Sequence, residues 1–175
     1  MNEVLKAMKE RRSVRSYTET MPEKEKIEQI IEAGLYAASG MGKQSPVILA
    51  VTDRKLRDRL AEANRKIGGW EGDFDPFYGA PAVLVVLADK TVPTAVYDGS
   101  LVMGNMMLAA HALGLGSCWI HRAKQEFEEE EFLAVLKELG CEGEFEGIGN
   151  MILGYPAGDI PAAKERKEGR VFFAE

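Results

Sequence analysis

Apolar residues recur at helical spacing in the first third of the chain. After Pro22 they fall at Ile27, Ile30, Ile31 and Gly34, with Glu and Lys between them, which predicts an amphipathic helix starting near Thr20–Pro22. Residues 2–11 predict a shorter helix. Asp53 precedes a charged stretch with a single apolar face, and we expect it to cap a third helix.

Four short apolar runs predict strands, at 47–51, 81–87, 117–120 and 148–153. The run at 81–87 contains no polar residue, as in a strand buried on both faces. A charged stretch at 126–139 predicts a late helix that ends at Gly140. Because strands and helices alternate without simple βαβ spacing, we expect an α+β fold with one mixed, mostly antiparallel sheet flanked by helices.

Residues 99–120 contain no charged side chain other than a protonated His111. A helix that is apolar on every face is buried in a core or at an obligate interface. In a chain this small, two copies sharing the helix across a two-fold axis is a reasonable hypothesis. The aromatic end of the tail, Val171-Phe172-Phe173, is expected to pack on a partner subunit.

Composition limits the class of protein. With 175 residues, the chain is expected to form one domain spanning residues 1–175. The net charge of −6 argues against nucleic acid or an anionic membrane as partner. No apolar run is long enough to span a bilayer, and we expect cytoplasmic residence. Cys118 and Cys141 lie far apart and are expected to be reduced thiols, with no metal site.

Positive charge is concentrated in two clusters at opposite ends of this acidic chain. The first is Arg11-Arg12-Ser13-Val14-Arg15, and the second is Lys164-Glu165-Arg166-Lys167. Guanidinium groups match the geometry of phosphate with two parallel hydrogen bonds. If the fold brings the clusters together, they could hold one phosphate from both sides. The alternative is that Arg11–Arg15 only ends a surface helix.

Four stretches together resemble the nitroreductase-like flavoprotein family. They are Arg11–Tyr17, Ala38–Pro46 (Ala-Ser-Gly-Met-Gly-Lys-Gln-Ser-Pro), Gly114–Ile120 (Gly-Leu-Gly-Ser-Cys-Trp-Ile), and Leu153–Pro156 followed by Lys164–Arg166. The resemblance implies an FMN-binding homodimer with two active sites at the subunit interface. It also implies ping-pong hydride transfer from NAD(P)H through flavin N5 to a small aromatic acceptor of the nitroaromatic or quinone type.

The resemblance also assigns roles to particular residues. The FMN phosphate and ribityl chain would be held by Arg11, Arg12, Ser13, Lys164 and Arg166. The isoalloxazine would be contacted from the second subunit by Ser39, Met41 and Gln44. The segment passing the flavin rings, whose N–H groups reach N5 in the family, would be Trp119, Ile120, His121 and Arg122. The catalytic residues would be Arg15, near the N1 and O2 edge, and His121, as a proton donor.

The chain departs from the family pattern at two places beside N5. Gly42 replaces an Asn in the 38–46 loop, and His121-Arg122 replaces an acidic or small residue followed by Gly. These changes leave open a specialised dehalogenase or dehydrogenase of the same fold. A separate alternative is a non-catalytic flavin-binding redox sensor. The aromatic loop Gly68–Tyr78 could be a lid over the flavin or a hydrophobic plug over the core.

Overall fold

The computed structural model describes residues 2–174, and a four-stranded antiparallel sheet lies at its centre. The strands are β1 (Pro46–Val51), β2 (Ala82–Asp89), β3 (Gly116–Ile120) and β4 (Phe145–Gly154), in the order β1-β2-β4-β3. All three strand pairs are antiparallel, whereas the isolated bridge between Ser13 and Ser117 is parallel. The α+β class is therefore confirmed, with a sheet that is antiparallel rather than mixed.

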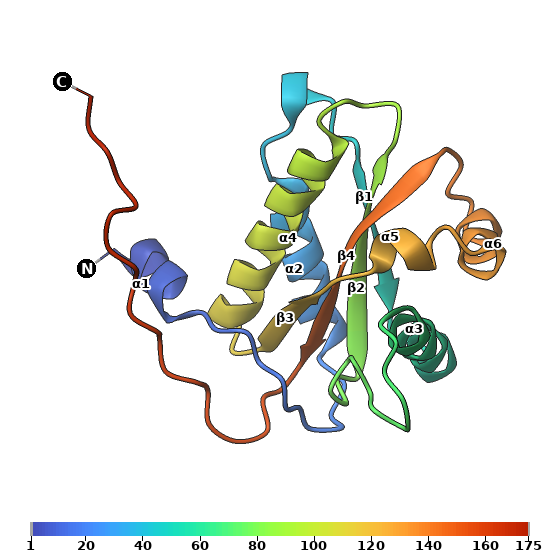
Figure 1. Ribbon diagram of the computed structural model, residues 1–175, viewed down its shortest axis with the longest axis horizontal. Helices are drawn as coiled ribbons and strands as arrows, with labels where there is room; N and C mark the ends of the chain where they lie inside the picture. The colour runs from blue at the N-terminus through green and yellow to red at the C-terminus, as the bar shows by residue number, and fades with distance from the viewer. Residues whose placement is uncertain (1, 175) are drawn as a thin grey trace.

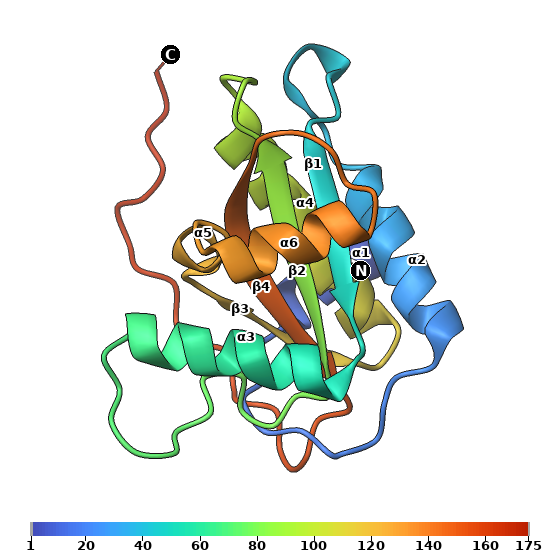
Figure 2. The same ribbon diagram turned by 90° about the vertical axis from the view of Figure 1, so that its right-hand side faces the viewer.

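Helices cover both faces of the sheet. One face carries α2 (Lys24–Leu35) and α4 (Ala95–Ala112), and the other carries α3 (Arg54–Ile67), α5 (Ala123–Glu126) and α6 (Glu130–Glu138) (Figures 1 and 2). Residues 82–88 of β2 have no exposed surface, because helices pack against both sides of the strand. The prediction of a doubly buried strand is confirmed.

The prediction of one continuous helix at 126–139 is wrong, because the helix is interrupted between α5 and α6. Phe127 and Phe132 are both buried, with ring centroids 5.8 Å apart. Residues five positions apart point to different sides of a continuous helix. The interruption at 127–129 lets both rings reach the core. It also divides the run of carboxylates at 128–131, of which only the last two lie in α6.

Helix α4 is buried on one side only. Val102, Met103, Met106 and Ala110 lie in the core, while Leu101 and Tyr97 are 51% and 72% exposed. The expectation of burial all round therefore fails within a single chain. An uncharged helix face remains open to solvent.

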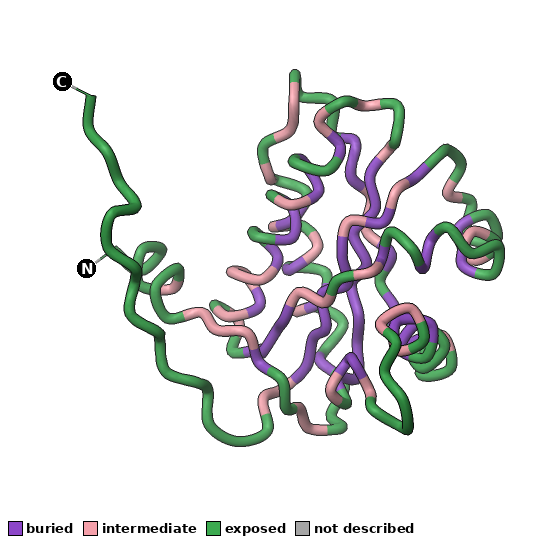
Figure 3. The backbone as a smooth tube through the Cα atoms, viewed as in Figure 1, coloured by how far each residue is buried: buried purple, intermediate pink, exposed green. Residues whose placement is uncertain are grey.

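The two ends of the described chain lie to one side of the sheet. Helix α1 (Glu3–Glu10) is capped by the Asn2 side chain and meets the rest of the chain near the end of α4. The tail after β4 runs past α1 as an extended segment, exposed along its length (Figures 1 and 3). Phe172 and Phe173 are 87% and 85% exposed.

Candidate functional site

The two basic clusters line one cavity of about 610 Å³ between α1 and the tail. Arg11 and Arg12 follow the last turn of α1, and Lys164 and Arg166 face them from the tail. The other lining residues are Met8, Lys9, Ala163 and Glu165. Clusters more than 150 positions apart in the sequence are thus brought together, as the phosphate hypothesis required.

Two buried donors on residues that line this cavity have no partner. Arg11 Nη1 and Arg12 Nε are buried and make no hydrogen bond within residues 2–174. Arg12 Nη1 donates to the Lys9 and Arg11 carbonyls at 2.6 and 2.7 Å, which fixes the guanidinium in place. Buried donors without acceptors are costly, so this arrangement suits an anionic oxygen ligand.

Residues 13–17 connect this cavity to the sheet. Val14 N donates to the Ser117 carbonyl at 3.0 Å, and Tyr17 Oη donates to the Val14 carbonyl at 2.7 Å. Burial raises the pKa of Tyr17, so the phenol remains a donor. The segment carrying Ser13 and Arg15 therefore lies beside the start of β3, with the Arg15 side chain exposed.

The end of β3 carries the segment predicted to pass the flavin rings. Trp119 and Ile120 end the strand, and the rings of Trp119 and His121 are 5.9 Å apart. The Arg122 guanidinium stacks over Trp70, with Cζ 4.4 Å from the ring centroid. The indole Nε1 of Trp119 is buried without a partner within residues 2–174.

The 38–46 loop lies away from the basic cavity within one chain. It passes through the short turn η1 (Gly40–Gly42), at the top of Figure 1, whereas α1 lies at the opposite end of α4. Ser39 Oγ accepts from Gln44 N at 3.0 Å, and the Gly40 amide donates to Asp98 at 2.9 Å. The structure therefore does not bring Ser39, Met41 and Gln44 to the basic cavity.

Backbone strain is concentrated in the predicted site. Within residues 2–174 the non-glycine residues with positive φ are Met41, Gln44, Tyr78 and Arg122. Such a conformation costs about 1–3 kcal/mol and persists only where the surroundings enforce it. Three of the four were predicted to contact the cofactor.

The Gly68–Tyr78 loop is fixed at its base and exposed at its tip. Asp75 accepts from Arg57 at 2.5 Å and from the amides of Phe77 and Gly79 at 2.8 Å. Phe77 is fully buried, as the plug hypothesis expects, whereas Trp70 and Phe74 remain partly exposed. The lid hypothesis therefore applies only to the tip.

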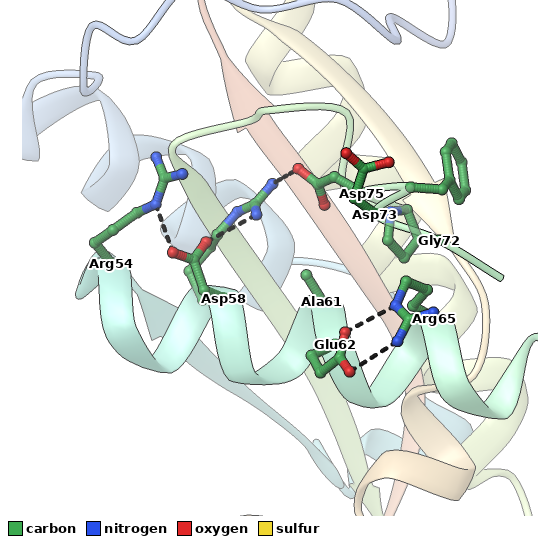
Figure 4. Close-up of a pocket in the computed structure, with 11 residues that line it drawn as sticks. Arg54, Asp58, Ala61, Glu62, Arg65, Gly72, Asp73 and Asp75 are labelled. Atoms are coloured by element: carbon green, nitrogen blue, oxygen red, sulfur yellow. Dashed lines mark hydrogen bonds and ion pairs between the residues drawn. The ribbon is translucent and has the colours of Figure 1, made fainter. Parts of the chain in front are cut away.

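Between this loop and α3 lies a cavity of about 370 Å³ (Figure 4). Its arginines already bind carboxylates: Arg54 binds Asp58, Arg57 binds Asp75 and Arg65 binds Glu62. Because these cations are neutralised, the cavity is poorly suited to an anionic ligand. The pair of Arg57 with Asp75 holds the loop to the helix, and the other two pairs lie within α3.

A buried carboxyl group, that of Glu126, was not predicted from the sequence. Glu126 has no exposed surface and accepts from Asn64 at 2.5 Å and from Asn150 at 2.8 Å. Burial raises the pKa of Glu126 to about 7. No local motif predicts the cluster of Asn64, Glu126 and Asn150, because its members come from α3, α5 and β4.

Residues 2–174 contain no helix long and apolar enough to cross a membrane, and no group of three or more His, Cys, Asp or Glu residues arranged to hold a metal ion. Cys118 and Cys141 are both free thiols, as expected.

The chain thus combines an antiparallel sheet between two helical layers with a basic cavity between α1 and the tail. A model of the Nitroreductase family matches residues 8–155, and the chain belongs to that family. A relative from Archaeoglobus fulgidus, whose name contains the term NAD(P)H nitroreductase, is 32% identical over 89% of this chain and 87% of its own.

Solved structures agree with this assignment. A nitroreductase with bound FMN from Bacteroides fragilis is 31% identical, with a TM-score of 0.88 and full coverage of both chains. A second, from Desulfitobacterium hafniense and also with bound FMN, is 25% identical with a TM-score of 0.87 and the same coverage. The predicted family and fold are confirmed.

Proposed function

We propose that this protein is an FMN-dependent oxidoreductase that takes hydride from NAD(P)H and passes two electrons to a small aromatic acceptor. The observation that carries the proposal is the cavity shared by Arg11, Arg12, Lys164 and Arg166. The nitroreductase structures with bound FMN, and a Bacillus subtilis relative named FMN reductase [NAD(P)H], support the choice of cofactor.

The residues present fit the phosphate end of FMN. The unpartnered Arg11 Nη1 and Arg12 Nε offer donors to phosphate oxygens, and Lys164 and Arg166 add charge from the other side. Ser13, held beside Ser117, follows Arg12 directly and is positioned for the ribityl hydroxyls. This arrangement gives an anion several charge-assisted hydrogen bonds at once.

Other residues would act on the reacting part of the site. FMN supplies reversible two-electron chemistry, in which NAD(P)H and the acceptor react in turn. We propose that Arg15 stabilises the negative charge that reduction leaves in the site. His121, at the turn after β3, is proposed to donate a proton to the acceptor, since imidazole is the side chain most often used for general acid catalysis. The same side of the flavin site would be lined by Trp119, Ile120 and Arg122.

A complete site would need a second copy of the chain. Ser39, Met41 and Gln44 lie away from the basic cavity, at the other end of α4. Between them α4 exposes an uncharged face that includes Tyr97 and Leu101, and exposed apolar surface of this kind marks association sites. We propose a homodimer through this face, in which the partner's 38–46 loop completes each site.

The direct test is whether the whole chain retains FMN after mixing with FMN and desalting. A titration with FMN then measures the dissociation constant. We expect a retained flavin spectrum. Loss of one charge-assisted hydrogen bond costs about 1.5–3 kcal/mol, so Arg166→Ala should weaken FMN binding about tenfold or more. The matched control is Lys167→Ala, in the same tail but outside the cavity lining.

Two outcomes would count against this function. A folded wild-type protein that stays colourless would remove the cofactor proposal, and the clusters would revert to charges at helix and chain ends. Equal weakening by Arg166→Ala and Lys167→Ala would remove the specific cavity. With FMN bound, a panel of nitro, quinone and halogenated acceptors separates a nitroreductase from a dehalogenase, and bound FMN without turnover would favour a sensor.

A further inference from the structure

Asn64, near the end of α3, is fully buried and bonds to two other parts of the chain. Its Nδ2 donates to the His121 carbonyl at 2.7 Å and to Glu126 Oε1 at 2.5 Å. An amide nitrogen carries two protons, so both donors are used. A single side chain therefore connects α3, the turn at 121–122 and α5.

Glu126 secures the other half of the turn. Its amide donates to the Arg122 carbonyl at 3.0 Å, and its second carboxyl oxygen accepts from Asn150 in β4 at 2.8 Å. The His121 carbonyl is thus held from α3 and the Arg122 carbonyl from α5. Gly147 of β4 allows this approach, since a Cβ there would lie 2.1 Å from the Ala123 carbonyl oxygen.

The side chain of Arg122 is held from α3 as well. It stacks over Trp70, and Trp70 is tied to Arg65 by two hydrogen bonds, from Trp70 N at 3.2 Å and to Trp70 O at 2.6 Å. Consecutive residues of α3 therefore fix both the turn and its stacking partner. Arg122 has φ of 85°, a conformation that a non-glycine residue keeps only under such constraint.

We propose that Asn64 is a positioning residue that holds the His121–Arg122 turn in its left-handed conformation and thereby sets the wall of the flavin site. The inference rests on the proposed function for its effect on FMN, but the holding of the turn does not depend on cofactor. Asn150 provides a matched comparison, because it supports the same carboxyl group without contacting His121.

The first experiment is hydrogen exchange by mass spectrometry on the protein without FMN, following peptides that span residues 118–126. In Asn64→Ala we expect exchange in this segment to accelerate about tenfold, the effect of losing one buried hydrogen bond. In Asn150→Ala the acceleration should be less than half as large on a logarithmic scale. If Asn64→Ala does not fold, Asn64→Ser leaves space for a water and serves instead.

A second measurement reads the stack itself. The chain has two tryptophans, so Trp119→Phe leaves Trp70 as the only indole. In that background, Asn64→Ala should increase acrylamide quenching of Trp70, since the guanidinium would leave the ring. Unchanged exchange and unchanged quenching in Asn64→Ala would overturn the proposal, whether or not the wild type binds FMN.

The third readout concerns the cofactor and separates this inference from the proposed function. FMN should bind more weakly to Asn64→Ala than to Asn150→Ala, by about threefold or more for a partly displaced wall. If the wild type binds FMN but the two variants bind it equally, the turn is no part of the flavin site and that part of the inference fails. If the wild type binds none, the proposed function fails, while the exchange data still decide whether Asn64 holds the turn.

Discussion

The carboxyl group of Glu126 is buried beside two side-chain amides and near two charges of opposite sign. Burial raises its pKa to about 7, the bonds from Asn150 and Asn64 lower it, Glu129 raises it and Arg122 lowers it. The folded protein therefore binds this proton more tightly than the unfolded chain, whose Glu pKa is 4.5. The resulting stability is fully present below pH 4.5 and is lost as the pH rises through 7.

We predict that Glu126→Gln removes this pH dependence. The gap between 4.5 and about 7 corresponds to about 3 kcal/mol. From pH 5 to pH 8, the free energy of unfolding of the wild type should fall by up to about that amount relative to Glu126→Gln. Urea denaturation at both pH values measures the difference. Parallel pH profiles for the two proteins would show that Glu126 is ionised throughout.

Arg15 is predicted to act on electron transfer more than on binding. Its side chain is exposed beside the start of β3, and it is absent from the lining of the basic cavity. Arg15→Ala should therefore slow reduction of bound FMN by saturating NADH, about tenfold for one lost stabilising charge, with a smaller change in FMN affinity. Arg166→Ala should do the reverse. Stopped-flow reduction compares them, and an unchanged rate in Arg15→Ala would remove its catalytic role.

Among the elements, the contact between α5 and β4 depends on a glycine. A Cβ at Gly147 would lie 2.1 Å from the Ala123 carbonyl oxygen, and backbone there cannot move aside cheaply. We predict that Gly147→Ala lowers the free energy of unfolding by about 1–3 kcal/mol, the cost of overpacking.

The matched control is Gly149→Ala on the same strand. There the added Cβ meets the Trp119 side chain at 2.3 Å, and a side chain can turn away more easily than backbone. Thermal and urea unfolding of both variants should show the larger loss at 147. A larger loss at 149 would mean that α5 moves more readily than Trp119.

Helix and strand positions followed from local patterns, whereas their breaks did not. The strands at 47–51 and 81–87 and the cap at Asp53 were predicted from apolar runs and side-chain chemistry, and the structure agrees. The split between α5 and α6 was missed, because it depends on Phe127 and Phe132 reaching one core. That core comes from distant segments that no local pattern contains.

For the whole molecule, the uncharged face of α4 predicts association. Leu101→Asp should convert the proposed dimer into a monomer, since an unpaired charge at an apolar interface is costly to bury. Leu139→Asp is the control, as Leu139 is 65% exposed but lies after α6, on the other side of the sheet. Sedimentation velocity measures both variants and the wild type. A monomeric wild type, or a dimeric Leu101→Asp, would contradict the proposed interface.

Part of the candidate site was also readable from the sequence. The two basic clusters were recognised because positive charge was concentrated in an acidic chain, and the fold brings them to one cavity. The cluster formed by Asn64, Glu126 and Asn150 was not predicted, because an Asn or Glu gives no sign of burial in its own sequence context. The buried polar groups of this cluster are hydrogen-bonded to partners 24 to 62 positions away in the sequence.

The sequence alone determined the α+β class, the cap at Asp53, the doubly buried strand and the residue types that suit a phosphate. These depend on side-chain chemistry and on periods of two or 3.6 residues, which are local properties. Only the tertiary structure decided that α1 and the tail face each other, that one side of α4 stays open, and that a buried amide holds the strained turn at Arg122. These are contacts between segments remote in sequence, and their geometry exists only after the sheet has brought the segments together.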